Sequence, residues 1–336
     1  MRHLLFILCL TLSLHAAFDK VATTAAPFLK MGVGARATAM GGGFVALADD
    51  GSALYWNPAG MTRTQGMSVT ASHNDWMLDI VHDYVGVTLS AGSNERIGVS
   101  VSSLTMGEQP VRTLENPDGT GLQYGVQDLA INLGYARQIT DLLSFGISGK
   151  LVQLRAYNET AQALALDIGS ILQTPHHGVR IGMALSNFGS DVKFEGRDLI
   201  IDTDIDPDID GNYNSDANLR TEPWPLPLMI RIGLSVDLLG KDQAVWQNSL
   251  NRLTLALDAD HPNDGPEHLN AGVEYAFQEK LFLRAGYRHN YDIEAFTMGV
   301  GTQLNLRGLG KVRVDYAIVP KERFGSTSIL SVEFLK

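Results

Sequence analysis

An alternation of apolar and polar residues runs through this chain from Gly66 to the C-terminus, and it constrains the fold more than any other feature. Between residues 143 and 151, the odd positions hold Leu, Phe, Ile, Gly and Leu, while the even positions hold Ser, Gly, Ser and Lys. Successive side chains of a β-strand point to opposite faces, so this period of two predicts a strand with one apolar and one polar face. About fourteen such segments follow one another, and most are roughly 9–13 residues long, the length with which a tilted strand crosses a bilayer.

The charged residues of these segments lie almost entirely on the polar side of the alternation. In a soluble β-sandwich the polar face meets bulk water, where Lys and Glu are abundant. Here that face holds mainly Gly, Ser, Thr and Asn, with scattered charges of both signs that could pair inside an enclosed space. The pattern favours an all-β fold, a transmembrane antiparallel β-barrel of about 14 strands, over a large soluble sandwich or solenoid. The charges concerned are Lys150, Asp167, Arg180, Arg231, Asp237, Asp258, Glu274, Arg284, Arg313, Asp315 and Glu333.

The connections between these segments differ in length in a regular way. If the first strand starts at the periplasm, the long connections 107–121 and 189–226 fall outside the cell, and the tight turns 93–94 and 140–141 fall on the periplasmic side. Outer-membrane barrels show this asymmetry, and their even strand number places both termini in the periplasm. We therefore expect a location in the outer membrane of a Gram-negative bacterium, with N- and C-termini periplasmic. The connection 240–251 departs from the rule, because it is long and yet periplasmic.

The first residues have the composition of a signal peptide. Arg2 and His3 precede an apolar run from Leu4 to Leu14, and Ala16 with Ala17 offers a cleavage site. We therefore assign residues 1–17 to a signal peptide, 18–65 to an N-terminal hatch or plug, and 66–336 to the barrel. The one cysteine, Cys9, lies in the signal peptide, so neither disulfides nor thiol chemistry is expected after cleavage.

Two further properties exclude whole classes of protein. No later stretch reaches 18 consecutive apolar residues, which excludes an α-helical membrane protein. The formal net charge is −11, which argues against a nucleic-acid partner because binding to phosphates requires a basic surface.

The segment 18–65 does not alternate and is rich in glycine and alanine. Ser52 is placed to cap a short helix that Pro58 and Gly60 would end. A lumen enclosed by fourteen strands is too wide for side chains alone to fill, so such a segment is suited to plug it. A phosphate-binding loop is the alternative, but the glycines are not followed by Gly-Lys-Ser/Thr, and no βαβ unit surrounds them.

This segment closely resembles the start of PorV/PorQ-family outer-membrane proteins. The resemblance is carried by the stretch 34–46, GARATAMGGGFVA, and by the stretch 55–60, YWNPAG. It implies a fourteen-stranded barrel whose lumen holds an N-terminal hatch, as in the distantly related FadL fatty-acid transporters. The chain departs from the usual pattern in ending Phe334-Leu335-Lys336 rather than on the aromatic residue. The hatch-motif residues that the resemblance indicates are Asp49, Asp50, Asn57, Pro58, Ala59 and Gly60.

The resemblance also implies a function without catalysis. A PorV-type barrel docks or shuttles secreted proteins, or secretion machinery of the type IX kind, within outer-membrane lipid. The alternative is a FadL-type passive transporter of hydrophobic molecules such as long-chain fatty acids, with a ligand pocket beside Leu54, Tyr55 and Trp56. An outer-membrane hydrolase is a third hypothesis, which no Gly-x-Ser-x-Gly motif supports.

No cofactor is expected, with one exception in the long acidic connection. Asp206, Asp208 and Asp210, followed by Gly211, copy the first half of a calcium-binding loop, in which alternating carboxylates point inward and glycine makes the turn. The twelfth position is Ala217 instead of the usual bidentate Glu. Structural calcium and a solvated acidic loop therefore both remain open.

Overall fold

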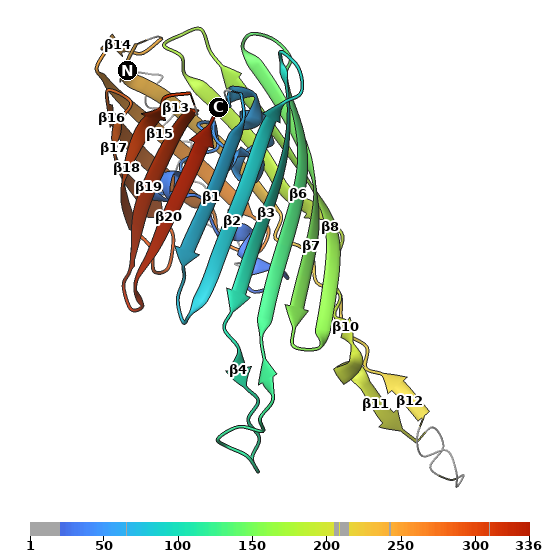
Figure 1. The fold of residues 1–336 in the computed structure, drawn as a ribbon. Coiled ribbons are helices and arrows are strands. Elements are labelled where there is room, and N and C mark those ends of the chain that lie inside the picture. Colours follow the sequence, from blue (N-terminus) through green and yellow to red (C-terminus); the bar gives the residue numbers. More distant parts are fainter. Residues whose placement is uncertain (1–20, 65, 205–207, 209–214, 242, 309) are drawn as a thin grey trace, which may run out of the picture.

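The chain forms one closed antiparallel β-barrel, which a computed structural model describes for residues 21–336 except 65, 205–207, 209–214, 242 and 309 (Figure 1). The main sheet has sixteen strands, and two of these, β10 and β14, are two-residue additions at its ends. The other fourteen close into a ring, because β1 pairs with β20 while β9 pairs with both β8 and β13. The predicted fold class and strand number are confirmed.

The ring strands are β1 (Ser68–Asp75), β2 (Ile80–Ser90), β3 (Glu95–Met106), β6 (Val126–Gln138), β7 (Leu143–Ala156), β8 (Glu159–Gln173), β9 (Arg180–Gly189), β13 (Met229–Gly240), β15 (Asn251–Pro262), β16 (His268–Phe277), β17 (Leu281–His289), β18 (Phe296–Leu306), β19 (Gly310–Lys321) and β20 (Gly325–Leu335). Smaller pieces are β4 (Gln109–Pro110), β5 (Gln123–Tyr124), β10 (Glu195–Gly196), β11 (Ile200–Thr203), β12 (Ser215–Asn218), β14 (Trp246–Gln247) and the 3-10 helix η3 (Arg197–Leu199).

The two ends of the barrel differ as the connection lengths predict. One end carries the C-terminus and the tight turns at 91–94 and 139–142, and the other, which we call the hairpin end, carries two long projections (Figure 1). These projections are not plain loops. The β3–β6 connection contains the hairpin β4–β5, and the β9–β13 connection contains the hairpin β11–β12. Pairing satisfies backbone groups that would otherwise depend on water, and short two-stranded pieces of this kind escape a search for bilayer-length alternation.

The outer wall is apolar and the inner wall polar along each strand. On β7, Phe145, Ile147 and Leu151 are exposed, whereas Ser148 and Lys150 are buried. So large a continuous apolar surface is unfavourable in water and suits contact with lipid tails. Among the described residues, no helix has the length and apolar character needed to cross a bilayer.

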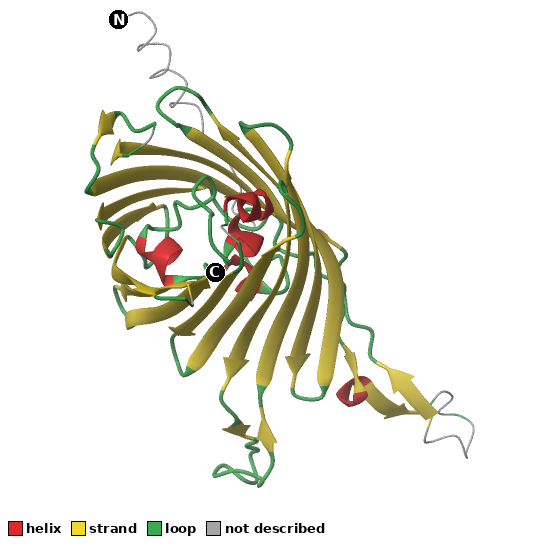
Figure 2. Cartoon of the chain, turned by 45° about the horizontal axis from the view of Figure 1, so that its top comes forward, coloured by secondary structure: helices red, strands yellow, loops and turns green. Residues whose placement is uncertain are grey.

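Residues 21–64, which we call the luminal segment, lie inside the barrel (Figure 2). The segment forms only short helical turns joined by irregular chain. These are η1 (Pro27–Lys30), α2 (Ala35–Ala39), α3 (Ala53–Trp56) and η2 (Pro58–Arg63). Helix α2 packs against β17–β20, and η2 packs against β3 and β6–β8 on the opposite wall, so the segment spans the lumen.

A ring of small residues lets the backbone of the luminal segment touch the wall. Each of the fourteen strands contributes one small residue on its inner face at the level of the segment. Several ring residues are direct cross-strand partners, such as Gly146 of β7 and Gly169 of β8. Between β6 and β7, the two ring residues are instead offset by two positions from direct pairing. This displacement keeps the ring level although the strands are tilted. The ring consists of Thr70, Gly86, Gly98, Gly134, Gly146, Gly169, Gly182, Gly233, Ala256, Gly272, Gly286, Gly299, Ala317 and Ser331.

Substituting a ring glycine should loosen the luminal segment. A Cβ atom at Gly146 would overlap the backbone of Pro58 and Ala59, whereas a Cβ at Gly149, on the same strand but facing outward, would meet nothing within 4 Å. We expect Gly146→Ala to cost about 1–3 kcal/mol of unfolding free energy through overpacking, and Gly149→Ala to cost much less. Denaturant unfolding in detergent micelles and limited proteolysis of residues 21–64 measure the difference. Equal effects of the two substitutions would contradict this account of the ring.

Candidate functional site: the luminal segment and its wall

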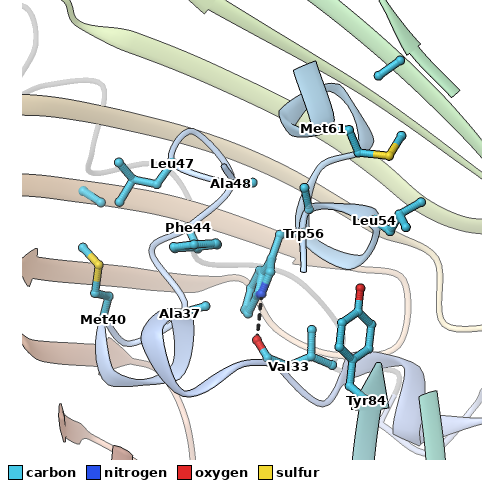
Figure 3. Packing of buried hydrophobic residues seen from close by; sticks show 13 residues of the cluster. Val33, Ala37, Met40, Phe44, Leu47, Ala48, Leu54, Trp56, Met61 and Tyr84 are labelled. Atoms are coloured by element: carbon cyan, nitrogen blue, oxygen red, sulfur yellow. Dashed lines mark hydrogen bonds between the residues drawn. The ribbon is translucent and has the colours of Figure 1, made fainter. Parts of the chain in front are cut away.

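An apolar cluster forms the centre of the luminal segment (Figure 3). The indole of Trp56 meets the ring of Phe44 edge-on at 6.0 Å between centroids. Its Nε1 donates a hydrogen bond of 3.0 Å to the Val33 carbonyl. Leu54 and Met61 fill the opposite side and contact the bare backbone at Gly98 and Gly134. Burying these side chains against one another holds together a segment with almost no regular secondary structure.

Asn57 ties two parts of the segment to the barrel wall. Its side chain is fully buried and accepts a hydrogen bond from the Ala59 amide at 3.1 Å, which caps η2. Its amide nitrogen donates to the carbonyls of Val45, at 3.0 Å, and Ser170 on β8, at 3.1 Å. Pro58 begins η2, where its missing N–H costs nothing. An Asn-Pro pair therefore serves as a cap and as a clamp between distant stretches.

Asp258 on β15 holds the middle of the segment from the other side. One carboxylate oxygen accepts hydrogen bonds from the backbone amides of Phe44, at 2.7 Å, and Val45, at 2.8 Å. These two amides lie in irregular chain, where they lack secondary-structure partners, so the wall supplies the acceptor that the segment cannot.

Buried ion pairs connect the segment to β16–β20. Arg36 of α2 contacts Asp49 at 2.5 Å and Glu274 of β16 at 2.9 Å. Glu274 is completely buried and also contacts Arg252, at 2.8 Å, and Arg284, at 2.6 Å. Three guanidinium groups thus surround one carboxylate.

The network continues around the wall through a second carboxylate of the segment. Asp50 receives Arg313 at 3.2 Å and also caps the turn at Ser52, whose amide donates to it at 2.9 Å. Arg313 is shared with Asp315, at 3.1 Å, and Glu333, at 2.5 Å. The interior charges that the sequence placed on the polar face therefore pair with one another, as charges removed from water must.

The network favours the charged forms of the luminal residues. Burial disfavours the charge of Arg36, but Asp49, Glu274 and Asp50 outweigh it and hold its pKa above the ordinary value. Burial likewise opposes ionisation of Asp49, yet Arg36, Arg63 and Arg313 lower the pKa of its carboxyl below the ordinary value. The Arg36–Asp49 pair therefore stays charged across the neutral pH range.

The site residues predicted from the sequence lie in more than one part of the structure. Asn57, Pro58, Ala59 and Gly60 lie together against β7 and β8, while Asp49 and Asp50 lie in the ion-pair network. The residues proposed for a ligand pocket are largely used in packing. Leu54 is fully buried, and Trp56 borders a cavity lined by charged and apolar groups together. Tyr55 packs half-buried against Trp56 and under the guanidinium of Arg231.

The predicted calcium site cannot be located. Asp206 and Asp210 lie outside the described residues, and the site remains a prediction that calorimetric titration of the purified barrel with calcium checks. Within the described part of the chain, no group of three or more His, Cys, Asp or Glu side chains is arranged to hold a metal ion.

Several residues of the site escaped the sequence argument. The sequence places Glu274, Arg284 and Arg313 on the inner face, but it does not show that Glu274 binds both Arg36 and Arg284. The available signal was that charges of both signs occur on neighbouring strands. Pairing them individually requires the strand register, which the sequence does not provide.

The geometry defines a class of protein, a closed fourteen-stranded outer-membrane barrel of FadL-like fold with its lumen occupied by the N-terminal part of the chain. A family model described as "Type IX secretion system protein PorV" matches residues 15–206, more than half of the chain. The chain belongs to this family, so it is an outer-membrane barrel associated with type IX secretion. The family and the FadL-like transporters are both non-enzymatic.

Solved structures agree on the fold. The Pseudomonas putida toluene transporter TodX has a TM-score of 0.59 at 13% identity, over 91% of this chain and 99% of that one. The CymD monoaromatic hydrocarbon channel has a TM-score of 0.58 at 13% identity, over 91% and 97%. A Pseudomonas aeruginosa FadL homologue has a TM-score of 0.54 at 10% identity, over 90% and 97%. At such identities the likeness establishes the architecture alone. A search of curated proteins finds no match.

Neutralising Glu274 should destabilise the barrel far more than neutralising Asp49. Glu274→Gln removes the carboxylate shared by the buried Arg36 and Arg284 and by the half-buried Arg252, and breaking such a buried pair costs about 3–5 kcal/mol. Asp49 is partly exposed and binds at the edge of the network, so Asp49→Asn should cost about 1 kcal/mol or less. Unfolding of the two variants in the same micelles measures the ratio. Equal losses would show that the network is not centred on Glu274.

The contribution of Asp49 should depend on pH with a defined sign. Its pKa is lower in the folded protein, so its stabilising effect is complete above the unfolded value of about 3.9 and is lost as the pH falls through the folded value. The difference in unfolding free energy between the wild type and Asp49→Asn should therefore be constant above about pH 5 and shrink below about pH 4. Denaturant titrations from neutral to acid pH test this. A difference that grows toward acid pH would contradict it.

Proposed function

We propose that this protein is a docking or shuttle component for secreted proteins, in which the luminal segment acts as a permanent hatch and the hairpin end receives the partners. The observation that carries the proposal is the attachment of the segment to opposite walls, by Asn57 on β8 and by Arg36 on β16. A lumen closed by buried hydrogen bonds and ion pairs is a poor conduit. Binding at the barrel surface is then the function that remains.

The hatch role falls on the residues of the shared motif. Asn57 with Pro58 and Ala59 would fix the hatch to β7 and β8, Gly60 would allow its close approach to Ala48, and Asp49 and Asp50 would hold it electrostatically. We propose no catalytic role for any of them.

The hairpin end is proposed to face the cell exterior. Its base is joined to the hatch, because the Ala25 amide donates to the Pro225 carbonyl at 2.9 Å, and Phe28 packs in one cluster with Val192 and Leu226. The C-terminus, at the opposite end, would then be periplasmic, as predicted. The first described residues of the hatch lie at the hairpin end, whereas the N-terminus itself is outside the described residues.

Transport of hydrophobic molecules is the second candidate, and the fold shared with TodX and CymD favours it. Against it, Leu54 is fully enclosed, and the cavity beside Trp56 has charged groups such as Arg231 and Asp260 among its lining residues. The apolar groove of about 390 Å³ at Leu257, Val273 and Tyr287 lies on the outer wall, where lipid tails would fill it. A fatty-acid path through the lumen would require the hatch to move.

Removing the β11–β12 hairpin tests the docking role. Replacing residues 197–220 by a short Gly-Ser linker keeps the base of the connection, where Val192 and Trp224 exchange backbone hydrogen bonds of 2.8 and 2.9 Å. We expect co-purification of type IX components and secreted proteins from solubilised outer membranes to fall by at least about tenfold, equivalent to about 1.4 kcal/mol. The unfolding midpoint of the barrel should be unchanged, since neither hatch nor wall is altered.

The matched control replaces residues 243–247, in the connection at the opposite end, by the same linker and should retain the partners. Unchanged co-purification after removal of the hairpin would contradict docking at this end. If removal of the hairpin left all protein partners bound, and mass spectrometry found fatty acid on the purified barrel, the result would favour transport.

A further inference from the structure

A largely apolar groove of about 560 Å³ lies at the hairpin end, where the start of the luminal segment meets the base of the β11–β12 projection. Ala22 and Ala25 line it on the side of the segment, and Phe194 and Trp224 line it on the side of the projection. These side chains can be reached from outside, since Trp224 is 47% exposed, Ala22 is exposed, and Phe194 and Ala25 are half-buried. An exposed aromatic residue in an apolar groove is typical of a surface that binds a partner.

The groove faces the mouth of the barrel and not the bilayer. Val192 and Trp224 form an antiparallel bridge, so their side chains lie on the same face of the paired chain. Val192 is buried in one cluster with Phe28 of the luminal segment and Ala163 of β8. Leu164, the next residue of β8, is 67% exposed and belongs to the outer wall. Trp224 therefore lies on the inner side of the wall, where lipid tails do not fill the groove.

The projection that forms one side of the groove is strongly acidic. The β9–β13 connection contains ten Asp or Glu residues and three Lys or Arg residues. Lys193 contacts Glu195 at 3.6 Å and Arg197 contacts Asp198 at 3.5 Å, so two of the three cations are already matched by neighbouring anions. The exposed Glu222 brings one charge of the remaining surplus to the groove itself. Such a surface repels the phosphates of lipopolysaccharide and of nucleic acids, and it attracts basic groups.

We propose that this groove receives an aromatic side chain from a basic segment of a protein partner. The ring would pack on Trp224 beside Ala22 and Ala25, and a neighbouring Lys or Arg of the partner would pair with Glu222. Burial of the ring supplies most of the affinity, because aromatic anchors in apolar pockets dominate binding. The acidic surroundings speed the encounter and select basic partners. The inference rests on the proposed docking function and names the chemistry of the partner.

The test is a calorimetric titration of the full-length barrel, purified in a nonionic detergent, with the peptide Lys-Lys-Phe-Lys-Lys. Two matched peptides replace the phenylalanine by serine or the four lysines by glutamates. We expect the first peptide to bind with a Kd between about 10 μM and about 1 mM, as suits one anchor and a few charges. The serine peptide should bind at least about tenfold more weakly, because it lacks the buried ring. The glutamate peptide should show no saturable binding, and raising the salt from about 50 mM to about 300 mM should weaken the first peptide several-fold.

Two variants of the barrel locate the binding in the groove. Trp224→Ala should weaken the phenylalanine peptide about tenfold or more, and Glu222→Gln about threefold, as expected for an exposed ion pair. The matched controls are Trp246→Ala, at an exposed tryptophan of the opposite end, and Glu115→Gln, at an exposed glutamate of the other projection. Both controls should bind the peptide as the wild type does. The unfolding midpoint should be unchanged in all four variants, since every altered side chain is exposed.

Saturable binding of the phenylalanine peptide that is weakened in both groove variants and kept in both controls supports the proposal. Equal binding of the serine or glutamate peptide, undiminished binding by Trp224→Ala, or binding that appears only after residues 18–20 are deleted would overturn it; the last result would assign the groove to the chain's own start. Co-purification from outer membranes separates this inference from docking. Partners that are lost on removal of the hairpin but retained by both groove variants would leave docking standing and overturn the groove. Partners retained after removal of the hairpin, with peptide binding to the wild type as expected, would overturn docking at the hairpin and support the groove.

Discussion

The interior of this barrel depends on one constraint, that charges brought out of water must find partners of opposite sign. Fourteen strands enclose more space than their own side chains fill, and the polar face of each strand carries ionisable groups into it. Arg36 meets Glu274 there, and Asp50 meets Arg313. Without the luminal segment, Asp258 would lose both of its amide donors, Glu274 would lose one of its three arginines, and Arg313 would lose one of its three carboxylates. The segment and the wall are therefore electrostatically incomplete without each other.

The same mutual dependence appears in the packing. The luminal segment has too little regular structure to satisfy its own backbone, so it borrows acceptors and donors from the wall, such as the Asp258 carboxylate for two amides. The wall in turn is bare at the level of the segment, with Gly146 and Gly169 facing Asn57 to Ala59. A barrel closed without the segment would have a groove of exposed backbone around its inside. This complementarity argues that segment and barrel fold as one unit.

The sequence predicts the barrel well because each membrane-spanning strand can be recognised from its own residues. Alternation at Leu143–Leu151 or Lys311–Ile318 requires no knowledge of neighbours, and the outer face must be apolar along its whole length. The site is harder to predict, because its chemistry depends on register. Nothing local says that Glu274 lies opposite Arg284, or that Leu54 is enclosed instead of lining a pocket. The hairpin β11–β12 escaped for a different reason, since four-residue strands outside the membrane carry no length constraint.

The cavity beside Trp56 and the long projections are placed differently from the ion-pair network that fixes the luminal segment. Two features lie toward the hairpin end: the cavity bordered by Asp260 and Asn270, and the base of the long projections at Val192 and Trp224. The residues that begin the luminal segment pass between these two features, since Lys30 binds Asp264 and Ala25 binds Pro225. The start of the luminal segment therefore connects the base of the projections to the cavity. This arrangement supports the proposed docking at the barrel surface, because the projections are joined to the luminal segment while the lumen is filled.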